Sequence, residues 1–451
     1  MMKIKNNKSL LVGVILCSYF HLMSSVNATP IPTGKSNEKF KLIPEQLQTL
    51  LPADVVPELA EKGRFDVGVR TIEITNPAQF DPATQTTKDR KLTLEVWYPS
   101  VVDATSVKTS YENETRTGIK FAIQAGAYRD EAVLNPDSNN KFPLVVISHG
   151  YTGYRTLMYY LAEHLASHGY VVAAIDHTDS TNAEVDIKNS PFAGFFSTLL
   201  NRSRDQQFTL DYFTTMQNFA SAAINNNKAG LIGYSMGGYG AVNAIGGCYN
   251  FTEATTSAFT GIKDPAQAQQ IMALLNSCAG GQYKNVKVDP KWQAVIAMAP
   301  WGGQHNLFKQ EALAKINTPI LYIAGDLDDI SGYEGIKSLY EKTGSQDKYL
   351  LTYQNARHNI APHPAPSVAK VSEIDIGHYY ESAWDSVVLN NTNKHFSVAM
   401  MDCYLKQEQD KCTYLDLSKN SNQIAVDGKT PKPWKGFDHR YSTGMNWHKA
   451  K

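Results

Sequence analysis

The segment Gly233-Tyr234-Ser235-Met236-Gly237 decides the fold, because it follows the apolar run 229–232 and precedes a helix-compatible stretch. A serine on so sharp a turn from strand to helix holds a strained backbone conformation, so its neighbours two positions away must be nearly free of side chains. Gly233 and Gly237 meet this need, and small residues at 238, 240 and 241 let the next helix pack closely. The segment therefore predicts a serine presented as a nucleophile at the end of a buried strand.

Continuous apolar runs follow one another along the middle of the chain and alternate with helix-compatible segments. Such runs suit strands buried on both faces of a parallel sheet, so the alternation predicts the α/β class with a mostly parallel, doubly wound sheet. Alternating apolar and polar residues predict an N-terminal antiparallel hairpin at an edge of this sheet, formed by 67–74 and 92–98. Together with the strand-serine-helix turn, this pattern predicts the α/β-hydrolase fold. The apolar runs lie at 144–147, 171–175, 230–232, 294–297 and 320–323, and the helical segments near 156–167, 204–224 and 236–246.

Composition divides the chain into four segments. Residues 1–28 form a signal peptide, and residues 29–65 form a polar leader that contains several prolines. The hydrolase domain spans 66–415 and contains a polar insertion at 249–290, while residues 416–451 form a tail.

The first 28 residues have the three parts of a secretory signal peptide. Lysines at positions 3, 5 and 8 precede the short apolar run 10–16, and Val26-Asn27-Ala28 supplies small residues for cleavage. The apolar run is too short for a lasting transmembrane helix, so we expect no stable membrane anchor. We expect cleavage near Ala28 and a secreted or periplasmic protein.

Charge and cysteine content narrow the possible partners. The sequence holds 43 basic and 43 acidic residues, so it offers no basic field for nucleic acid and no polybasic membrane patch. Four cysteines follow the signal peptide, which favours disulfides in an exported protein. Sequence proximity favours Cys248–Cys278 and Cys403–Cys412 among the three possible pairings. The cysteine spacings do not resemble a zinc site, and we expect neither metal nor cofactor; the oligomeric state stays open.

The acid of a catalytic triad should follow a later buried strand, because the order in this fold is serine, acid, histidine. The loop after the apolar run 320–324 reads GDLDDI at 325–330. Asp328 is the favoured acid, since it lies at the loop apex while Ile330 returns to the core. Asp326 and Asp329 remain alternatives.

The base should follow one further strand. The run 348–353 supplies that strand, and His358 stands in the short loop after it. His363, His378 and His395 lie further along, in segments that read as loop or helix. We therefore predict His358 as the base that takes the proton of Ser235.

An oxyanion hole needs two backbone N–H groups directed at the developing negative charge. One belongs to Met236, the residue after the nucleophile, and the other to the loop after the first central strand. That loop reads SHGYTG at 148–153, and the amide of Tyr151 is the expected donor. Its ring would also line the acyl pocket.

Several blocks resemble the platelet-activating-factor acetylhydrolase family and its bacterial relatives called dienelactone hydrolases. They are LEVWYP at 94–99, SHG at 148–150, RTL at 155–157, LASHGYVVAAIDH at 165–177 and NRSRD at 201–205. The resemblance covers roughly residues 65–440 and implies an α/β-hydrolase that acts on ester bonds. Two departures stand out. First, the animal acetylhydrolases carry their acid after the strand that follows the serine turn, but here that place reads APWGG at 299–303 and contains no carboxylate. Second, true dienelactone hydrolases use cysteine as the nucleophile, where this chain has Ser235.

A second, local resemblance is to cutinase-like polyester hydrolases. In those enzymes an aromatic residue in the oxyanion loop, a G-x-S-M-G turn and a Pro-Trp pair line an open cleft. Tyr151, Met236 and Trp301 match these positions. The resemblance implies that Trp301 and Tyr151 contact the substrate.

These observations predict an exported serine carboxylic-ester hydrolase with the triad Ser235, Asp328 and His358, acting through an acyl-enzyme. We expect a short-to-medium acyl or lipid-like ester as substrate. A cutinase-like hydrolase of polymeric or aromatic esters is the alternative. An acyltransferase and a non-catalytic binding protein of this fold also remain open. The insertion 249–290 would form a lid, and an apolar wall would come from Phe192, Phe195, Phe196, Leu199 and Leu200.

Overall fold

The computed structural model describes residues 42–422, 433–438 and 442–450. The predicted signal peptide and the first part of the leader, 29–41, lie outside the described residues. Along the described chain, no helix combines the length and the apolar character that crossing a membrane requires.

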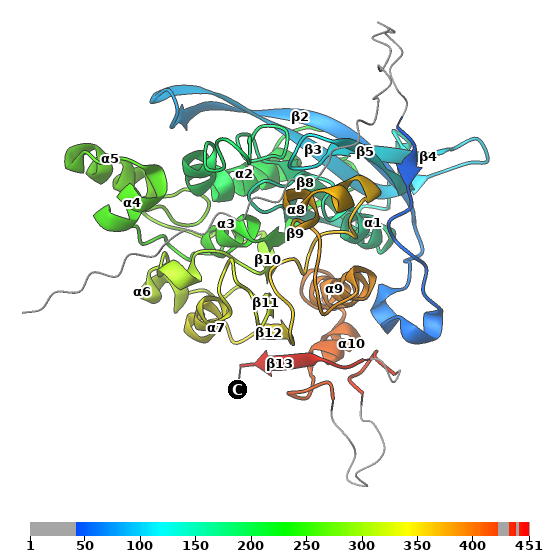
Figure 1. The fold of residues 1–451 in the computed structure, drawn as a ribbon. Coiled ribbons are helices and arrows are strands. Elements are labelled where there is room, and N and C mark those ends of the chain that lie inside the picture. Colours follow the sequence, from blue (N-terminus) through cyan, green and yellow to red (C-terminus); the bar gives the residue numbers. More distant parts are fainter. Residues whose placement is uncertain (1–41, 423–432, 439–441, 451) are drawn as a thin grey trace, which may run out of the picture. The chain divides into compact units, whose positions relative to one another are not determined.

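A single mixed sheet forms the centre of the domain that begins at residue 42 (Figure 1). Its strand order is β1-β5-β2-β3-β8-β7-β9-β10-β11-β12-β13, with β4 added beside β5 and β6 beside β3. The six strands from β8 to β12 in this order run parallel, and both flanks contain antiparallel pairs. The predicted mostly parallel α/β sheet is therefore confirmed. The strands are β1 (Pro44–Glu45), β2 (Asp66–Asp81), β3 (Thr86–Val101), β4 (Lys108–Glu114), β5 (Lys120–Arg129), β6 (Ala132–Val133), β7 (Phe142–Ser148), β8 (Val171–Asp176), β9 (Ile224–Tyr234), β10 (Trp292–Met298), β11 (Ile320–Gly325), β12 (Lys348–Tyr353) and β13 (Met445–Lys449).

Helices cover both faces of this sheet. Side chains of α1 and α9 pack into the apolar core on one face, and those of α2, α3 and α7 pack into the core on the other. This division gives the doubly wound arrangement, in which each parallel strand is buried on both sides. The helices are α1 (Tyr159–Ser167), α2 (Phe195–Thr215), α3 (Met236–Ala244), α4 (Glu253–Thr260), α5 (Pro265–Leu275), α6 (Gln310–Leu313), α7 (Tyr333–Lys342), α8 (Glu373–Ile376), α9 (Ser386–Met401) and α10 (Gln409–Cys412).

The predicted N-terminal hairpin is present as β2 and β3, which pair antiparallel along their length with Val69 opposite Trp97. It does not form the edge of the sheet, however. The strands β5 and β1 continue the sheet beyond β2, and β4 pairs with β5. The turn between β4 and β5, residues 115–119, carries Arg116.

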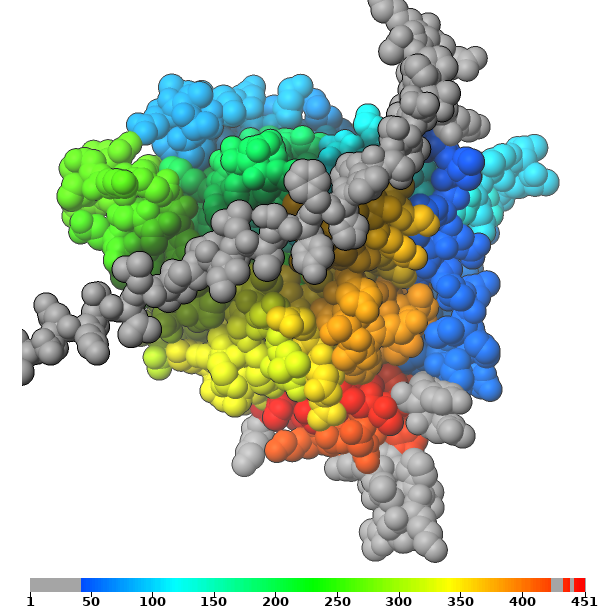
Figure 2. Space-filling model, in the orientation of Figure 1, coloured from blue at the N-terminus to red at the C-terminus, as the bar shows by residue number. Residues whose placement is uncertain are grey.

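Two disulfides join cysteines that are near in sequence, in the pairing that sequence proximity favoured. Cys248 pairs with Cys278, and Cys403 pairs with Cys412. The first closes a loop that contains α4 and α5, which project at one end of the face visible in Figure 2. The predicted insertion therefore contains two short helices, and the disulfide joins the ends of the segment that carries them.

A part of the predicted tail belongs to the sheet. β13 pairs antiparallel with β12, placing Trp447 opposite Leu351. Trp447 is buried and stacks on Phe396 of α9. The strand thus covers the edge of the sheet beside the strand that leads to His358.

Candidate active site

Ser235 lies on the tight turn between β9 and α3. Its backbone has φ 54° and ψ −113°, a positive-φ conformation that residues other than glycine rarely adopt. A Cβ on Gly233 would lie 2.2 Å from the carbonyl oxygen of Gly237, and one on Gly237 would lie 2.0 Å from that of Ser148. Only glycine fits at either position, which explains why the turn has the sequence pattern G-x-S-x-G.

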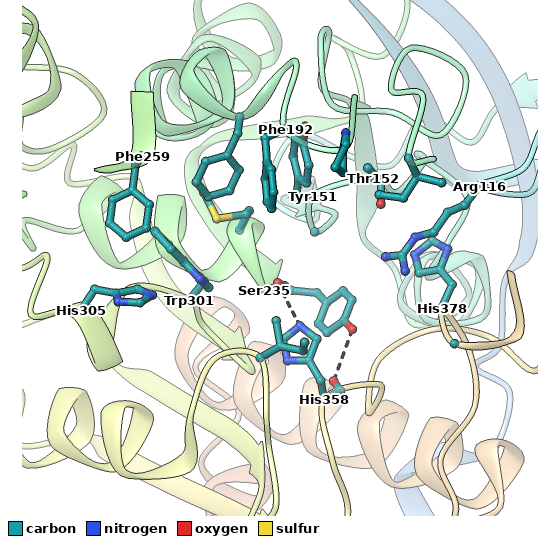
Figure 3. Close-up of a pocket in the computed structure, with 18 of the residues that line it drawn as sticks. Arg116, Tyr151, Thr152, Phe192, Ser235, Phe259, Trp301, His305, His358 and His378 are labelled. Carbon is teal, nitrogen blue, oxygen red and sulfur yellow. Dashed lines mark hydrogen bonds between the residues drawn. The ribbon is translucent and has the colours of Figure 1, made fainter. Parts of the chain in front are cut away.

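The structure brings Ser235, His358 and Asp328 into one hydrogen-bonded chain. The Oγ of Ser235 lies 3.0 Å from Nε2 of His358, and the dashed line between the two side chains in Figure 3 marks this hydrogen bond. On the other side of the ring, Nδ1 lies 2.9 Å from Oδ2 of Asp328. This order of contacts orients the imidazole so that Nε2 can accept the serine proton while Nδ1–H stays bound to the carboxylate.

The three candidate acids have separate partners. The Oδ1 of Asp328 accepts hydrogen bonds from the backbone N–H groups of Ile330 and Ser331, which fix the carboxylate behind His358. Asp326 instead accepts the N–H of Asn355, and Asp329 pairs with Arg357 at 2.6 Å. Among the three, the structure places Asp328 against the histidine.

Ile330 does not return to the core as the sequence suggested. It is 56% exposed and lines the pocket at Ser235. The reason is that Asp328 occupies the buried position in this loop, with 5% exposure, so the loop turns outward after it.

The two expected oxyanion donors flank the serine. Met236 opens α3, where N–H groups of the first turn have no acceptor within the helix. Tyr151 and Gly150 line the same pocket, and a Cβ built on Gly150 would lie 3.0 Å from the Cβ of Ser235. The loop 148–153 therefore passes close to Ser235, as its expected role requires.

A buried network holds this loop from behind. The guanidinium of Arg202 donates to the carbonyl oxygen of His149 at 3.1 Å and to Oγ of Ser180 at 2.8 Å. Burial lowers the pKa of Arg202 to about 9. Burial, together with the nearby Arg202 charge, holds the pKa of His149 well below its usual range, so that ring stays neutral. In the sequence, NRSRD at 201–205 is visible only as a block of family resemblance, with no signal for the role of Arg202.

A cavity of about 810 Å³ opens over Ser235. One side is aromatic: the Trp301 ring lies 5.5 Å from Phe195 and 5.3 Å from Phe259 of α4, measured between centroids. Tyr151 meets the same Phe195 edge-on at 5.2 Å. Trp301 and Tyr151, both expected to contact substrate, therefore lie in one aromatic wall (Figure 3).

The predicted apolar wall from α2 is only partly at the pocket. Phe192 and Phe195 line it, and Phe192 is 73% exposed. Leu199 and Leu200 are buried in the core, and Phe196 packs against that core. Consecutive positions on a helix face different directions, so Phe196 and Leu200 turn away from the pocket. Leu199 lies one turn beyond Phe195 on the same face and is buried in the core instead.

Two polar residues that the sequence did not single out lie on the opposite side of Ser235. Arg116 comes from the turn between β4 and β5, and His378 follows α8; Figure 3 shows them side by side. Their segments carry no motif, so only the folded chain brings them to the pocket. In the part of the chain that the structure describes, no cluster of three or more His, Cys, Asp or Glu side chains is arranged to hold a metal.

Two family models match the chain. Residues 143–245 match the alpha/beta hydrolase fold, and residues 62–192 match platelet-activating factor acetylhydrolase, isoform II. The chain has the α/β-hydrolase fold. The family resemblance noted in the sequence is thereby confirmed, and the first match spans the turn that carries Ser235.

The relatives include cutinases and a terephthalate ester hydrolase. The chain is 26% identical to cutinase est1 of Thermobifida alba over 242 residues, which is 52% of this chain and 60% of the cutinase. It is 34% identical to cutinase 2 of Thermobifida cellulosilytica over 211 residues, 46% of this chain and 56% of the cutinase. A bis(hydroxyethyl) terephthalate hydrolase of Streptomyces coelicolor is 26% identical over 52% of this chain and 56% of its own length. The similarity thus spans less than two thirds of each of these relatives.

Among solved structures, a ferulic acid esterase from Streptomyces cinnamoneus has the same fold. The TM-score is 0.53, and the match covers 86% of this α/β-hydrolase and 97% of the esterase. Sequence identity is 16%, so this similarity concerns the fold alone.

Proposed function

We propose that this α/β-hydrolase cleaves carboxylic esters through a serine-bound acyl intermediate. The observation that carries the proposal is the hydrogen-bonded chain from Oγ of Ser235 through His358 to Asp328 beneath an open pocket. Serine is a weak nucleophile without a base, and this arrangement supplies one. The similarity to cutinases supports the same reaction.

In the first half of the reaction, Oγ of Ser235 attacks the ester carbonyl carbon while Nε2 of His358 takes its proton. The carbonyl oxygen becomes negative and accepts hydrogen bonds from the N–H groups of Tyr151 and Met236. Asp328 stabilises the imidazolium. When the tetrahedral intermediate collapses, the C–O bond to the alcohol breaks, and His358 donates its proton to the departing oxygen.

In the second half, water replaces the alcohol. His358 takes a proton from the water as its oxygen attacks the acyl carbon, and the same oxyanion donors stabilise the second intermediate. Collapse breaks the bond to Oγ of Ser235, which recovers a proton from His358. The products are a carboxylic acid and the free enzyme.

The aromatic wall favours esters with an apolar or aromatic group. Trp301, Phe195 and Phe259 offer ring faces and edges within one pocket, which suits a short or medium acyl chain and also an aromatic unit. The aromatic wall over Ser235 would also suit an aromatic unit of a longer polymer, so hydrolysis of a polymeric ester is the second candidate. The two disulfides suit work in an oxidising compartment outside the cytosol.

Initial rates on p-nitrophenyl esters of increasing acyl length test the proposal, with Ser235→Ala as the matched control. Loss of such a nucleophile lowers kcat roughly a millionfold, so the variant should show no detectable hydrolysis. A fluorophosphonate label should attach to the wild type and not to the variant. Labelling without turnover of any ester would favour an acyltransferase, and absence of both would favour a binding protein. Release of soluble acids from a polyester film would support the second candidate.

A further inference from the structure

The pocket at Ser235 contains one cation that has no counter-charge. Among the described residues that line it, Arg116 is the one arginine or lysine, and there is no aspartate or glutamate. The Nε of Arg116 is buried without a hydrogen-bond partner, and the ion pairs of the described chain do not include this residue. A guanidinium stays protonated at neutral pH, so the pocket carries a positive charge that no acid in its own lining offsets.

One acid, Asp375, influences Arg116 electrostatically but makes neither a hydrogen bond nor an ion pair with it. Asp375 interacts with Arg116 through space, yet both of its carboxylate oxygens accept hydrogen bonds from Thr117, one from the backbone N–H at 2.9 Å and one from Oγ1 at 2.5 Å. Burial lowers the pKa of Arg116, which reflects the cost of a charge that lacks a partner. A buried charge of this kind is expensive unless a ligand completes it.

His378 adds a second unsatisfied group at the same place. Its side chain is 97% buried, since the residue is 3% exposed, and its Nδ1 has no hydrogen-bond partner in the described chain. Burial and the neighbouring Arg116 charge hold the pKa of His378 well below its usual range, so the ring is neutral and can donate one hydrogen bond. Two independent groups therefore lack a partner on one side of the pocket.

These groups stand across Ser235 from the aromatic wall. Figure 3 shows Arg116 and His378 on one side of the serine and Trp301 with Phe259 on the other. An ester bound at Ser235 would extend in both directions. One end would lie against aromatic rings, and the other would reach a guanidinium and an imidazole.

We propose that Arg116 and His378 bind a monoanionic group of the substrate, so that the enzyme prefers esters that also carry a carboxylate or a phosphodiester. The inference rests on the proposed ester hydrolysis and names its substrate class. One guanidinium balances one negative charge, and its planar fork can donate two parallel hydrogen bonds to such a group. A half-ester of a dicarboxylic acid and an ester of a hydroxybenzoic acid both have this form.

The test compares acidic and neutral esters of the same size. The acyl-side pair is 4-nitrophenyl hydrogen suberate and 4-nitrophenyl octanoate, and the leaving-group pair is 4-carboxyphenyl hexanoate and 4-carbamoylphenyl hexanoate. For at least one pair, wild-type kcat/KM should favour the acid. Arg116→Gln should lower kcat/KM on that acid by roughly 10- to 100-fold, the range for hydrogen bonds to a charged group, and leave the neutral partner nearly unchanged. His305→Gln, on the aromatic side, is the matched control and should leave the ratio between acid and neutral ester as it is.

Each other outcome has a distinct meaning. Hydrolysis of both esters with a ratio that Arg116→Gln does not alter would overturn the anion site and leave the ester hydrolase standing. Failure of the wild type on all four esters would instead count against the proposed function. Inhibition of octanoate hydrolysis by benzoate or by diethyl phosphate distinguishes a carboxylate from a phosphodiester.

A direct measurement covers the case in which Arg116→Gln fails to fold. Arg116→Lys keeps the charge and loses the fork, so it should retain part of the preference for the acid. Calorimetry of benzoate binding to Ser235→Ala, with and without Arg116→Lys, should show weaker binding in the double variant. Equal binding would overturn the proposal.

Discussion

The hydroxyl of Ser148 lies 2.8 Å from Nε2 of His177, and Nδ1 of the same ring lies 2.9 Å from the carboxylate of Asp205. The contacts repeat those of Ser235, His358 and Asp328, yet Ser148 is completely buried. The burial removes any path for a substrate. This second chain of contacts therefore supports the strand end from which the oxyanion loop departs.

We expect Ser148→Ala to lose stability and keep activity. The substitution leaves Nε2 of His177 and the side-chain amide of Gln206 without the hydroxyl that both now contact, at a cost of roughly 1 to 3 kcal/mol in the free energy of unfolding. A fluorophosphonate should still label Ser235 in this variant, as peptide mapping would show. Label on Ser148 in the wild type would contradict this view.

The acid can be assigned by three matched substitutions. Asp328→Asn should lower kcat by roughly 10⁴-fold, because the amide no longer holds His358 in the required tautomer. Asp326→Asn and Asp329→Asn remove carboxylates that contact Asn355 and Arg357 instead, so kcat should stay within a few-fold of wild type. A large loss in either of these two variants would reassign the acid.

The strained turn at Ser235 predicts a difference between two inactive variants. Glycine adopts φ 54° readily, whereas alanine retains the Cβ that makes this conformation unfavourable. Ser235→Gly should therefore be about 1 kcal/mol more stable than Ser235→Ala. Urea unfolding measures both, and equal midpoints would show that the turn stores no strain.

Acid should destabilise the protein through its buried histidines. Burial lowers the pKa of His395 to about 3, while the unfolded chain has a value near 6.5. Between these values the unfolded state binds the proton and the native state does not. Stability is thus complete above about pH 6.5 and falls as pH drops toward 3, by about 1.4 kcal/mol per pH unit for this histidine.

The variant His395→Gln isolates that contribution. Between pH 6 and pH 4 its unfolding free energy should depend less on pH than that of the wild type, by about 1.4 kcal/mol per pH unit, the effect of one proton. Urea unfolding at several pH values measures this slope. An unchanged slope would mean that His395 is protonated in the native state as well.

Removing each disulfide should have different effects on activity. By chain entropy, opening Cys248–Cys278, with a separation of 30 residues, should cost roughly 3 to 4 kcal/mol, and opening Cys403–Cys412, with 9, roughly 2 to 3. The first loop carries Phe259 of the aromatic wall, so its double serine variant should also raise KM for bulky aromatic esters. The second should leave that KM unchanged. A shift in KM from the second pair alone would argue against the wall.

The central sheet was predictable because its strands are buried on both faces and read as unbroken apolar runs. The outer strands were harder. β4 and β5 carry polar residues on their exposed side, and β13 reads MNWHK, with only Met445 and Trp447 buried. Such strands form because a neighbouring edge offers backbone partners, and this tertiary influence leaves little trace in local composition.

The residues of the site also fall into a group that the sequence could predict and a group that it could not. Ser235 and His358 follow strands in an order that the fold imposes, so position along the chain was enough to single them out. Arg116 and His378 reach the pocket from a hairpin turn and from a loop after a short helix, and no spacing links them to the serine. Three neighbouring aspartates competed for one place, and only backbone geometry separates Asp328 from the other two.

The strand β13 also bears on the protein's solubility. β12 has β11 on one side, and without β13 its other side would expose a row of unpaired backbone N–H and C=O groups. Such an open edge is a template for strands of other molecules. Loss of Met445–Lys449 would therefore turn the strand before His358 into a nucleus for aggregation, and the protein would be lost from solution before its chemistry could be measured.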